Sequence, residues 1–436
     1  MRFPSTLFGN REAEDYTGPA DFGTSPRGML LQRRLPLNAR LPSSVGRVKL
    51  GSLATITNQR DLTYPLEILM LRHGLLIVSC FGLLVPQSVQ SADAKTKPKA
   101  WTEAPQDDAD YPFQGEYLGS VINDCRQCEP VGLQVVAMGD AKFSAVTYRG
   151  GLPGYGWPIG GDRTKFQGTR EGSVLTLTGE HQHITIQNGH TIIKSIGEYP
   201  RQIGTASFVT RQSATLGACR PCNAIALFDG TNTELLKDGQ MTADGLLKEG
   251  TETRDAYGDF RLHLEFRLPY MPKAVGQQRA NSGIYVQSRY EVQVLDSFGL
   301  DGEFNECGAL YREVKPNLNM CLPPLSWQTY DIWFRAPRFD ADGKKVANAN
   351  FTVWLNGVPV HENLDLPTPT GGGKRVGEGP NALPTKIQNH SNPVRFQNIW
   401  LVHHGIAGTC NNQLVASTEA SNALAGLLSK IGYSKN

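Results

Sequence analysis

The chain has 436 residues, enough for two or three domains, and its composition already excludes several classes of protein. Lys and Arg number 43 against 41 Asp and Glu, so the net charge of +2 provides no basic field and no nucleic-acid partner is expected. Charged residues make up only 19%, whereas Gly (46) and Pro (27) are frequent, a mixture typical of turn-rich all-β proteins. The mean hydropathy of −0.33 leaves room for one apolar segment and excludes a polytopic membrane protein.

That apolar segment spans residues 74–85, directly after a short basic stretch. Its 12 residues are too few to cross a bilayer comfortably, and the small residues at 91–94 suit a signal peptidase. We therefore expect translation to begin at Met70, with residues 70–94 as a signal peptide and 1–69 as a disordered stretch upstream of the true start. The mature chain would then be periplasmic or extracellular. An unusually long leader or a single anchoring helix is the alternative.

Export would also decide the chemistry of the cysteines. Two C-x-x-C pairs are formed by Cys125, Cys128, Cys219 and Cys222. Their matched spacing predicts that the pairs lie close together in a structural role, either as disulfides or as a Cys₄ zinc site. Cys307 and Cys321 would close a loop of about 14 residues if paired. Residues 77–80, which end at Cys80, resemble a lipoprotein box, but the apolar run continues beyond Cys80.

Two all-β domains are predicted along the mature chain. After a polar linker at 95–110, short runs of alternating apolar and polar residues at 111–211 indicate a small sandwich or barrel. A second linker at 212–224 precedes a region, 225–404, in which strands again alternate. Two facing antiparallel sheets, a jelly roll, are the natural architecture for so many strands. The tail, 405–436, is rich in Ala and Leu and is expected to hold at most one short helix.

The strand predicted at 290–296 carries the first candidate catalytic group. Glu291 and Gln293 share one face of it, while the residues between them enter the core. Strict alternation places Asp296 on the core face, but a one-residue bulge would return it to the Glu291 face. A carboxylate, an amide and a second carboxylate in one groove would suit acid–base chemistry on a sugar. The exposed polar face of an ordinary strand is an equal alternative.

A second candidate cluster lies near the end of the jelly-roll region. His390 stands in a polar loop that enters the last strand, and Arg395 lies on one face of that strand. Histidine carries protons near neutrality and arginine is a fixed cation for a developing oxyanion, although a lone loop histidine is more often merely solvated. No P-loop, G-x-S-x-G or H-E-x-x-H motif is present, so no cofactor is evident. Glu, Asp and His in one groove would still suit a divalent metal.

Several motifs of the second domain resemble, in order, the 3-keto-disaccharide hydrolase family, also described as 3-keto-glucoside 1,2-lyase/hydratase. They are Leu227 to Thr231 (LFDGT), Asn281 to Tyr285 (NSGIY), Tyr290 to Asp296 (YEVQVLD), Gly308 to Tyr311 (GALY), Trp327 to Tyr330 (WQTY), Asn356-Gly357, and Asn389 to Ile399. The resemblance covers residues 225–404 and implies a concanavalin A-like (laminin-G-like) jelly roll acting on sugars oxidised at C3. One departure is Asn389, where the family pattern has an acid, which removes a carboxylate.

The resemblance implies an enzyme that cleaves 3-keto-glycosides by C2 deprotonation, elimination of the glycosidic bond and hydration, and the expected signal peptide implies that it is secreted. We expect Glu291 to be the base, His390 the acid or its partner, and Arg395 with Gln293 to be donors to the enediolate. Tyr285 and Asp296 are the further substrate contacts. A lectin-like binding protein, or a retaining β-glycosidase using Glu291 and Asp296, is the alternative. All three readings predict a carbohydrate partner, and none predicts an integral membrane domain in the mature chain.

Overall fold

The computed structural model describes residues 97–123 and 125–403. In these ranges the regular structure is almost entirely strand, with three short 3₁₀ helices, η1 (Tyr111–Phe113), η2 (Gly276–Gln278) and η3 (Gly371–Arg375). The predicted all-β class is therefore confirmed. None of the described helices has the length and apolar character needed to span a membrane. The predicted signal peptide, the upstream stretch and the tail helix lie outside the described residues.

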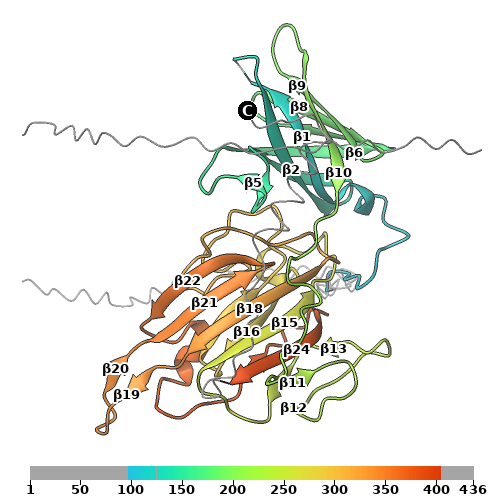
Figure 1. Cartoon of the computed structure of the whole chain (residues 1–436). Coiled ribbons are helices and arrows are strands. Elements are labelled where there is room, and N and C mark those ends of the chain that lie inside the picture. The colour runs from blue at the N-terminus through green and yellow to red at the C-terminus, as the bar shows by residue number, and fades with distance from the viewer. Residues whose placement is uncertain (1–96, 124, 404–436) are drawn as a thin grey trace, which may run out of the picture. The chain divides into compact units, whose positions relative to one another are not determined.

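The first domain is a closed barrel of eight antiparallel strands in the order β1-β10-β9-β8-β7-β6-β3-β2 (Figure 1). The strands are β1 (Gly115–Ile122), β2 (Cys128–Gly139), β3 (Lys142–Arg149), β6 (Arg163–Glu171), β7 (Val174–Thr178), β8 (Gln182–Gln187), β9 (His190–Ser195) and β10 (Gln202–Val209). Alternation places the apolar residues inside the barrel: in β7, Leu175 and Leu177 are buried while the threonines beside them face solvent. Asn188 and Gly189 both have positive φ, 49° and 74°, and form the turn between β8 and β9. Of the two architectures open from the sequence, the chain adopts the barrel.

The second domain is a sandwich of two main sheets, as the predicted jelly roll requires. The seven-stranded sheet contains β11 (Ile225–Phe228), β24 (Arg395–His403), β15 (Phe260–Arg267), β18 (Trp327–Arg335), β21 (Ala349–Leu355) and β22 (Val358–Leu366) in this order, with β13 (Leu247–Lys248) paired to β24. The five-stranded sheet contains β12 (Leu236–Lys237), β14 (Thr251–Thr253), β23 (Lys386–Ile387), β16 (Ser282–Val286) and β17 (Tyr290–Val294). Two-residue or three-residue strands β4 (Leu152–Pro153) with β5 (Gly156–Trp157), and β19 (Arg338–Phe339) with β20 (Lys345–Ala347), form minor ladders.

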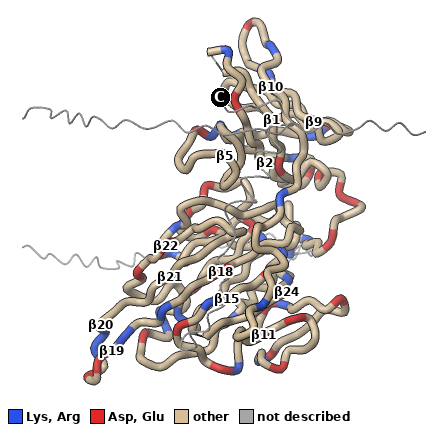
Figure 2. The backbone as a smooth tube through the Cα atoms, in the orientation of Figure 1, with Lys and Arg blue, Asp and Glu red and all other residues tan. Residues whose placement is uncertain are grey.

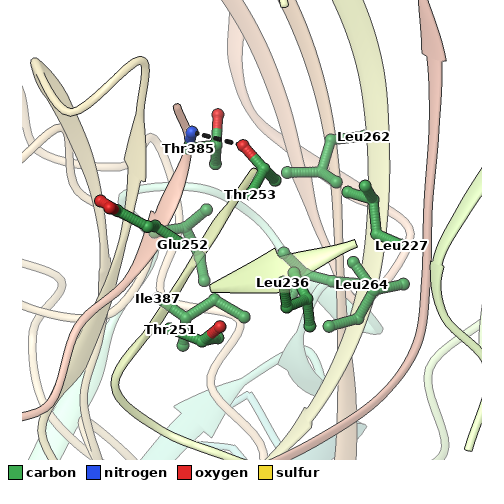
Figure 3. A pocket seen from close by; sticks show the side chains of 11 residues that line it. Leu227, Leu236, Thr251, Glu252, Thr253, Leu262, Leu264, Thr385 and Ile387 are labelled. Atoms are coloured by element: carbon green, nitrogen blue, oxygen red, sulfur yellow. Dashed lines mark hydrogen bonds between the residues drawn. The ribbon is translucent and has the colours of Figure 1, made fainter. Parts of the chain in front are cut away.

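The core of the sandwich lies between these two sheets. It includes the fully buried rings of Phe260, Phe266, Tyr290, Tyr330 and Phe351. A small cavity of ≈ 20 Å³ remains between the sheets, and Figure 3 shows leucines from both sheets around it. Its wall is almost wholly apolar, so this cavity is a packing gap rather than a site for a hydroxylated ligand. We call the face of each sheet that is turned away from this core its outer face.

In the described part of the chain, barrel and sandwich belong to one compact unit. Tyr270, which follows β15, packs into the barrel core, and Arg279 Nη2 donates to the Ala137 carbonyl of β2 at 3.4 Å. Exposed ion pairs such as Lys165 with Asp301 add little stability. Charged residues of both signs are interspersed along the described chain (Figure 2), in keeping with the small net charge.

Neither a disulfide nor a zinc site is formed by the C-x-x-C pairs in the described part of the chain. All six described cysteines are free thiols, and those of the two pairs are exposed. Among residues 97–123 and 125–403, no three His, Cys, Asp or Glu side chains gather in a way that could hold a metal, so the four cysteines form no zinc site. Cys128 begins β2 of the barrel, and Cys219 and Cys222 lie in the linker that follows the barrel.

Candidate active site

The outer face of the five-stranded sheet carries the candidate catalytic strand, β17. Val292 and Val294 point into the core, so Glu291 and Gln293 lie on the outer face, as the alternation predicts. On the neighbouring strand β16, Tyr285 lies directly opposite Glu291. β17 runs through Val294 without a bulge. The sheet therefore places a carboxyl, a phenol and an amide side by side.

Glu291 is buried although it faces outward, with only 2% of its surface exposed. Burial raises the pKa of Glu291 to about 7, and the Tyr285 hydroxyl and the Arg312 charge offset part of this effect. Its Oε2 atom has no hydrogen-bond partner in the protein. A carboxyl group that is half ionised at neutral pH, with one free oxygen, has the properties of a general acid or base.

Gly283, on β16, creates the space that the carboxyl group occupies. A Cβ atom at this position would lie 2.4 Å from Glu291 Oε1, too close for any non-bonded contact. Only glycine therefore allows the carboxyl to lie flat over the neighbouring strand. The glycine of the Asn-Ser-Gly run at 281–283 is therefore explained by the space that Glu291 needs.

Amide side chains extend the polar surface away from Glu291. Gln293 Nε2 donates to Gln277 Oε1 at 3.0 Å, and Asn281 Nδ2 donates to the Gln277 carbonyl at 2.8 Å. Gln388, which follows β23, donates weakly to the Tyr285 hydroxyl at 3.5 Å. Two further buried acceptors in this group, Asn281 Oδ1 and Gln388 Oε1, lack a protein partner. Such orphaned acceptors are rare, and here three of them, including Glu291 Oε2, surround one surface.

Two loops cover this surface. The segment 308–311 runs along β17, with the Tyr311 N–H donating to the Glu291 carbonyl at 3.0 Å. Arg312 is exposed, and its guanidinium lies 5.2 Å from the Tyr311 ring centroid. The backbone of Arg312 is left-handed (φ 63°), a conformation that non-glycine residues rarely adopt outside constrained sites. The loops thus supply an aromatic ring and a cation beside Glu291.

The second covering loop is glycine-rich. Thr370 Oγ1 accepts the Glu291 N–H at 2.6 Å, and the glycines of η3 follow immediately. A Cβ atom on Gly373 would lie 1.8 Å from the Arg289 carbonyl oxygen, so this close approach requires glycine. The loop therefore holds the catalytic strand through backbone contacts and limits access to Glu291.

The predicted His390 lies at the edge of this surface. It is exposed in the loop after β23, and the residues on either side of it are bonded to β16 or its start. The Gln388 N–H donates to the Gly283 carbonyl of β16 at 2.9 Å. Asn392 Oδ1 accepts the N–H of Asn281, the residue just before β16, at 2.7 Å. The loop therefore brings His390 to the end of the sheet where Asn281 stands.

Two predicted residues do not join the surface. Asp296 lies beyond the end of β17, where its Oδ2 accepts from Arg279 Nε at 2.6 Å and its Oδ1 from the Phe298 N–H at 3.3 Å. Arg395 belongs to the other sheet, on its outer face, and pairs with Glu249 at 3.0 Å. The expectation of one groove for Glu291, Gln293, His390 and Arg395 is therefore wrong for Arg395, because β24 lies across the core from β17.

Sequence reasoning missed four contributors to the site: Gln277, Arg312, Thr370 and the glycines of η3. Three consecutive glycines at 371–373 were a readable signal of close backbone approach. Arg312 and Gln277 had no such signal, because their places depend on how irregular loops fold back over β17.

A second buried polar cluster occupies the outer face of the seven-stranded sheet. His263 is fully buried, with Nδ1 2.7 Å from Asp331 Oδ1 and its ring stacked on Trp400 at 4.9 Å between centroids. His263 Nε2 is 3.6 Å from Glu265 Oε1, too far for a hydrogen bond but close enough for strong charge attraction. Burial alone would lower the pKa of His263, but the two carboxylates outweigh it and raise the pKa to about 9. The imidazole is therefore charged at neutral pH.

The interdomain linker covers this cluster. Thr215 Oγ1 donates to Asp331 Oδ2 at 2.8 Å, and the Gly217 N–H donates to Glu265 Oε1 at 2.7 Å. Glu265 also accepts from Gln397 Nε2 at 2.7 Å. Because linker residues donate hydrogen bonds to both carboxylates, the cluster fastens the linker to the seven-stranded sheet. The cluster and the Glu291 surface lie on different sheets.

The comparisons with known proteins concern the sandwich. Residues 223–402 match the model of a family described as the 3-keto-alpha-glucoside-1,2-lyase-like domain. The sandwich thus resembles this family, whose description names a glycoside-cleaving activity. No curated protein matches the chain.

Two solved structures from Parabacteroides distasonis, each titled a "putative glycosyl hydrolase", are similar to part of the chain. One is 29% identical, with 42% of this chain and 84% of the other covered and a TM-score of 0.38. The second is 16% identical, with 45% and 98% covered and a TM-score of 0.30.

Proposed function

We propose that the sandwich cleaves 3-keto-glycosides, 3-keto-disaccharides among them, by elimination followed by hydration. A ketone at C3 acidifies the proton on C2, so a base can remove it and form an enediolate. The electron pair then expels the oxygen on C1, which leaves as the alcohol once it is protonated. Water adds across the resulting C1–C2 double bond, and the net reaction is hydrolysis.

The residues on the outer face of the five-stranded sheet have the properties that this reaction needs. Glu291 is the proposed base at C2, because its pKa of about 7 lets it accept a proton at neutral pH. The Tyr285 hydroxyl orients this carboxyl group, and Arg312 takes the place of Arg395 as the cation that compensates the enediolate. His390 is the proposed acid at the leaving oxygen. Gln293 binds the substrate.

The observation that carries the proposal is the group of orphaned acceptors. Glu291 Oε2, Asn281 Oδ1 and Gln388 Oε1 are buried acceptors without protein donors, around one carboxyl group of raised pKa. A sugar offers hydroxyl donors at the spacing of neighbouring ring carbons, so it can satisfy several acceptors at once. An apolar or anionic ligand could not.

A retaining β-glycosidase is less well supported, since it needs a second free carboxylate near Glu291. Asp296, the candidate for that role, is committed to Arg279 and to the Phe298 N–H. A lectin-like binding module would use the same orphaned acceptors without turnover, and activity distinguishes it.

Purified full-length protein is expected to release the aglycone or second sugar from 3-keto-glucosides and to leave the matching unoxidised glucosides intact. The measurement is product release from the two substrates side by side, with and without a chelator to reveal a metal requirement. Turnover of the plain glucosides would favour the glycosidase, and binding without turnover of either would favour the lectin; both results would contradict the proposal.

We also propose that the chain is exported, on the strength of the short apolar segment at 74–85 and the small residues after it. The mature chain is expected to begin at residues 92–95. Edman sequencing of protein recovered from the periplasm or medium would measure this, and recovery of a chain that still carries residues 1–69 would refute it.

A further inference from the structure

Two buried thiols lie directly beneath the catalytic strand. Cys307 and Cys321 are 0% and 1% exposed, within the core of the sandwich. Cys321 Sγ lies 3.6 Å from the Leu295 carbonyl oxygen, at the end of β17. Cys307 Sγ lies 3.3 Å from the hydroxyl of Tyr330, which donates to the Gln293 carbonyl of β17 at 2.5 Å. Both sulfurs therefore lie against the same end of β17.

The backbone fixes both ends of the intervening loop at the same place. The Cys307 N–H donates to Ser297 Oγ at 2.8 Å, and Asn319 Nδ2 donates to the Ser297 carbonyl at 2.8 Å, two residues before Cys321. The loop between the thiols is therefore already closed by hydrogen bonds, so a covalent link needs little movement of its ends.

We propose that Cys307 and Cys321 form a disulfide when the chain folds in the presence of a low-molecular-weight disulfide. The thiolate of Cys307 attacks that disulfide, releases one thiol and forms a mixed disulfide. The thiolate of Cys321 then attacks the Cys307 sulfur and releases the second thiol. The two cysteines lose two protons and two electrons, and the small disulfide gains them.

In the folded core the two thiols have different environments. Burial raises the pKa of the Cys321 thiol. Burial acts on Cys307 too, but hydrogen bonds with Cys321 and the Tyr330 hydroxyl, 3.3 Å away, outweigh it and lower the pKa of Cys307. Because the native thiols are buried, the exchange must occur before the core closes.

The linked loop is the one that covers the candidate active site. It contains Tyr311 and Arg312, which lie beside Glu291. The disulfide would join the two ends of this loop and restrict its conformations in the folded and unfolded chain alike. This structural inference does not depend on the proposed reaction.

The test is oxidative refolding of the full-length chain, reduced and denatured, in a mixture of reduced and oxidised glutathione. Trypsin cleaves after Arg289, Arg312 and Arg335, so each thiol falls in its own peptide, 290–312 or 313–335. After alkylation of free thiols, mass spectrometry is expected to find the two peptides linked, two hydrogens lighter than their sum, and to find them separate after dithiothreitol. Separately alkylated peptides, or links from either one to a different cysteine, would overturn the proposal.

Thermal unfolding gives a second measurement. The refolded chain is expected to lose about 5–10 °C in Tm when dithiothreitol is added, as for a disulfide that closes a loop of about 14 residues. Cys307→Ala and Cys321→Ala should each abolish this loss, whereas Cys219→Ala, in the exposed pair, should leave it unchanged. A loss of Tm that survives in the Cys307 and Cys321 variants would place the responsible disulfide elsewhere.

Discussion

Replacement of Glu291 by Gln is expected to lower kcat on a 3-keto-glucoside about 10²-fold or more, with a much smaller change in KM. Gln keeps the shape of the side chain, so the packing over Gly283 is retained. What is lost is the proton acceptor, which the proposed reaction uses only on the way to the enediolate. Steady-state kinetics on the wild-type and variant chains measure the effect.

The pH dependence of the wild-type enzyme provides an independent check. The pKa of Glu291 is raised to about 7, and the base acts only when ionised. The value of kcat/KM should therefore rise as the pH increases through about 7 and level off above it. The residual activity of Glu291→Gln should lack this ascending limb.

Glu252 provides a matched control, since it is a glutamate on another strand of the same sheet that pairs with Lys237 and Lys386. Glu252→Gln should leave kcat unchanged. Gly283→Ala should reduce kcat in a folded chain, because the new Cβ displaces the carboxyl group. Full activity of Glu291→Gln, together with a flat pH profile, would show that another group is the base.

Strand periodicity was sufficient to predict much of this arrangement. The alternation in 290–294 predicted that Glu291 and Gln293 share a face, and β17 has that parity because its valines fill the core. The same period-two logic predicted both β domains. It left the barrel and the small sandwich undecided, because closure depends on which distant strands pair, here β1 with β10.

The parts that failed depend on long-range placement. Arg395 has the right chemistry, but parity within a strand does not reveal which sheet the strand joins. Asp296 would have joined the groove only through a bulge, which β17 lacks, and its carboxylate instead accepts a hydrogen bond from Arg279. The cysteine pairs have matched spacing yet lie on separate elements. Loop contacts such as that of Arg312 arise only after the loops fold back over the sheet.

His263→Gln is expected to destabilise the sandwich by about 3 kcal/mol at neutral pH. The substitution removes the positive charge between Asp331 and Glu265 and leaves two carboxylates buried without it. The linker should loosen at the same time, because Thr215 and Gly217 bind these carboxylates. Urea unfolding, followed by tryptophan fluorescence, measures the loss; Trp400 stacks on the imidazole and reports on the cluster directly.

The contribution of His263 should also disappear in alkali. Its folded pKa, about 9, lies above the unfolded value near 6.5, so folding stabilises the protonated form. That stabilisation is complete below about pH 6.5 and is lost as the pH rises to about 9. Wild type and His263→Gln should therefore differ in unfolding free energy at about pH 6 and converge at about pH 9.5. His361 is the matched control of opposite sign, since burial lowers its pKa and its contribution is lost in acid instead. A gap between wild type and His263→Gln that stays constant from about pH 6 to about pH 9.5 would mean that packing of the ring, rather than its charge, supports the cluster.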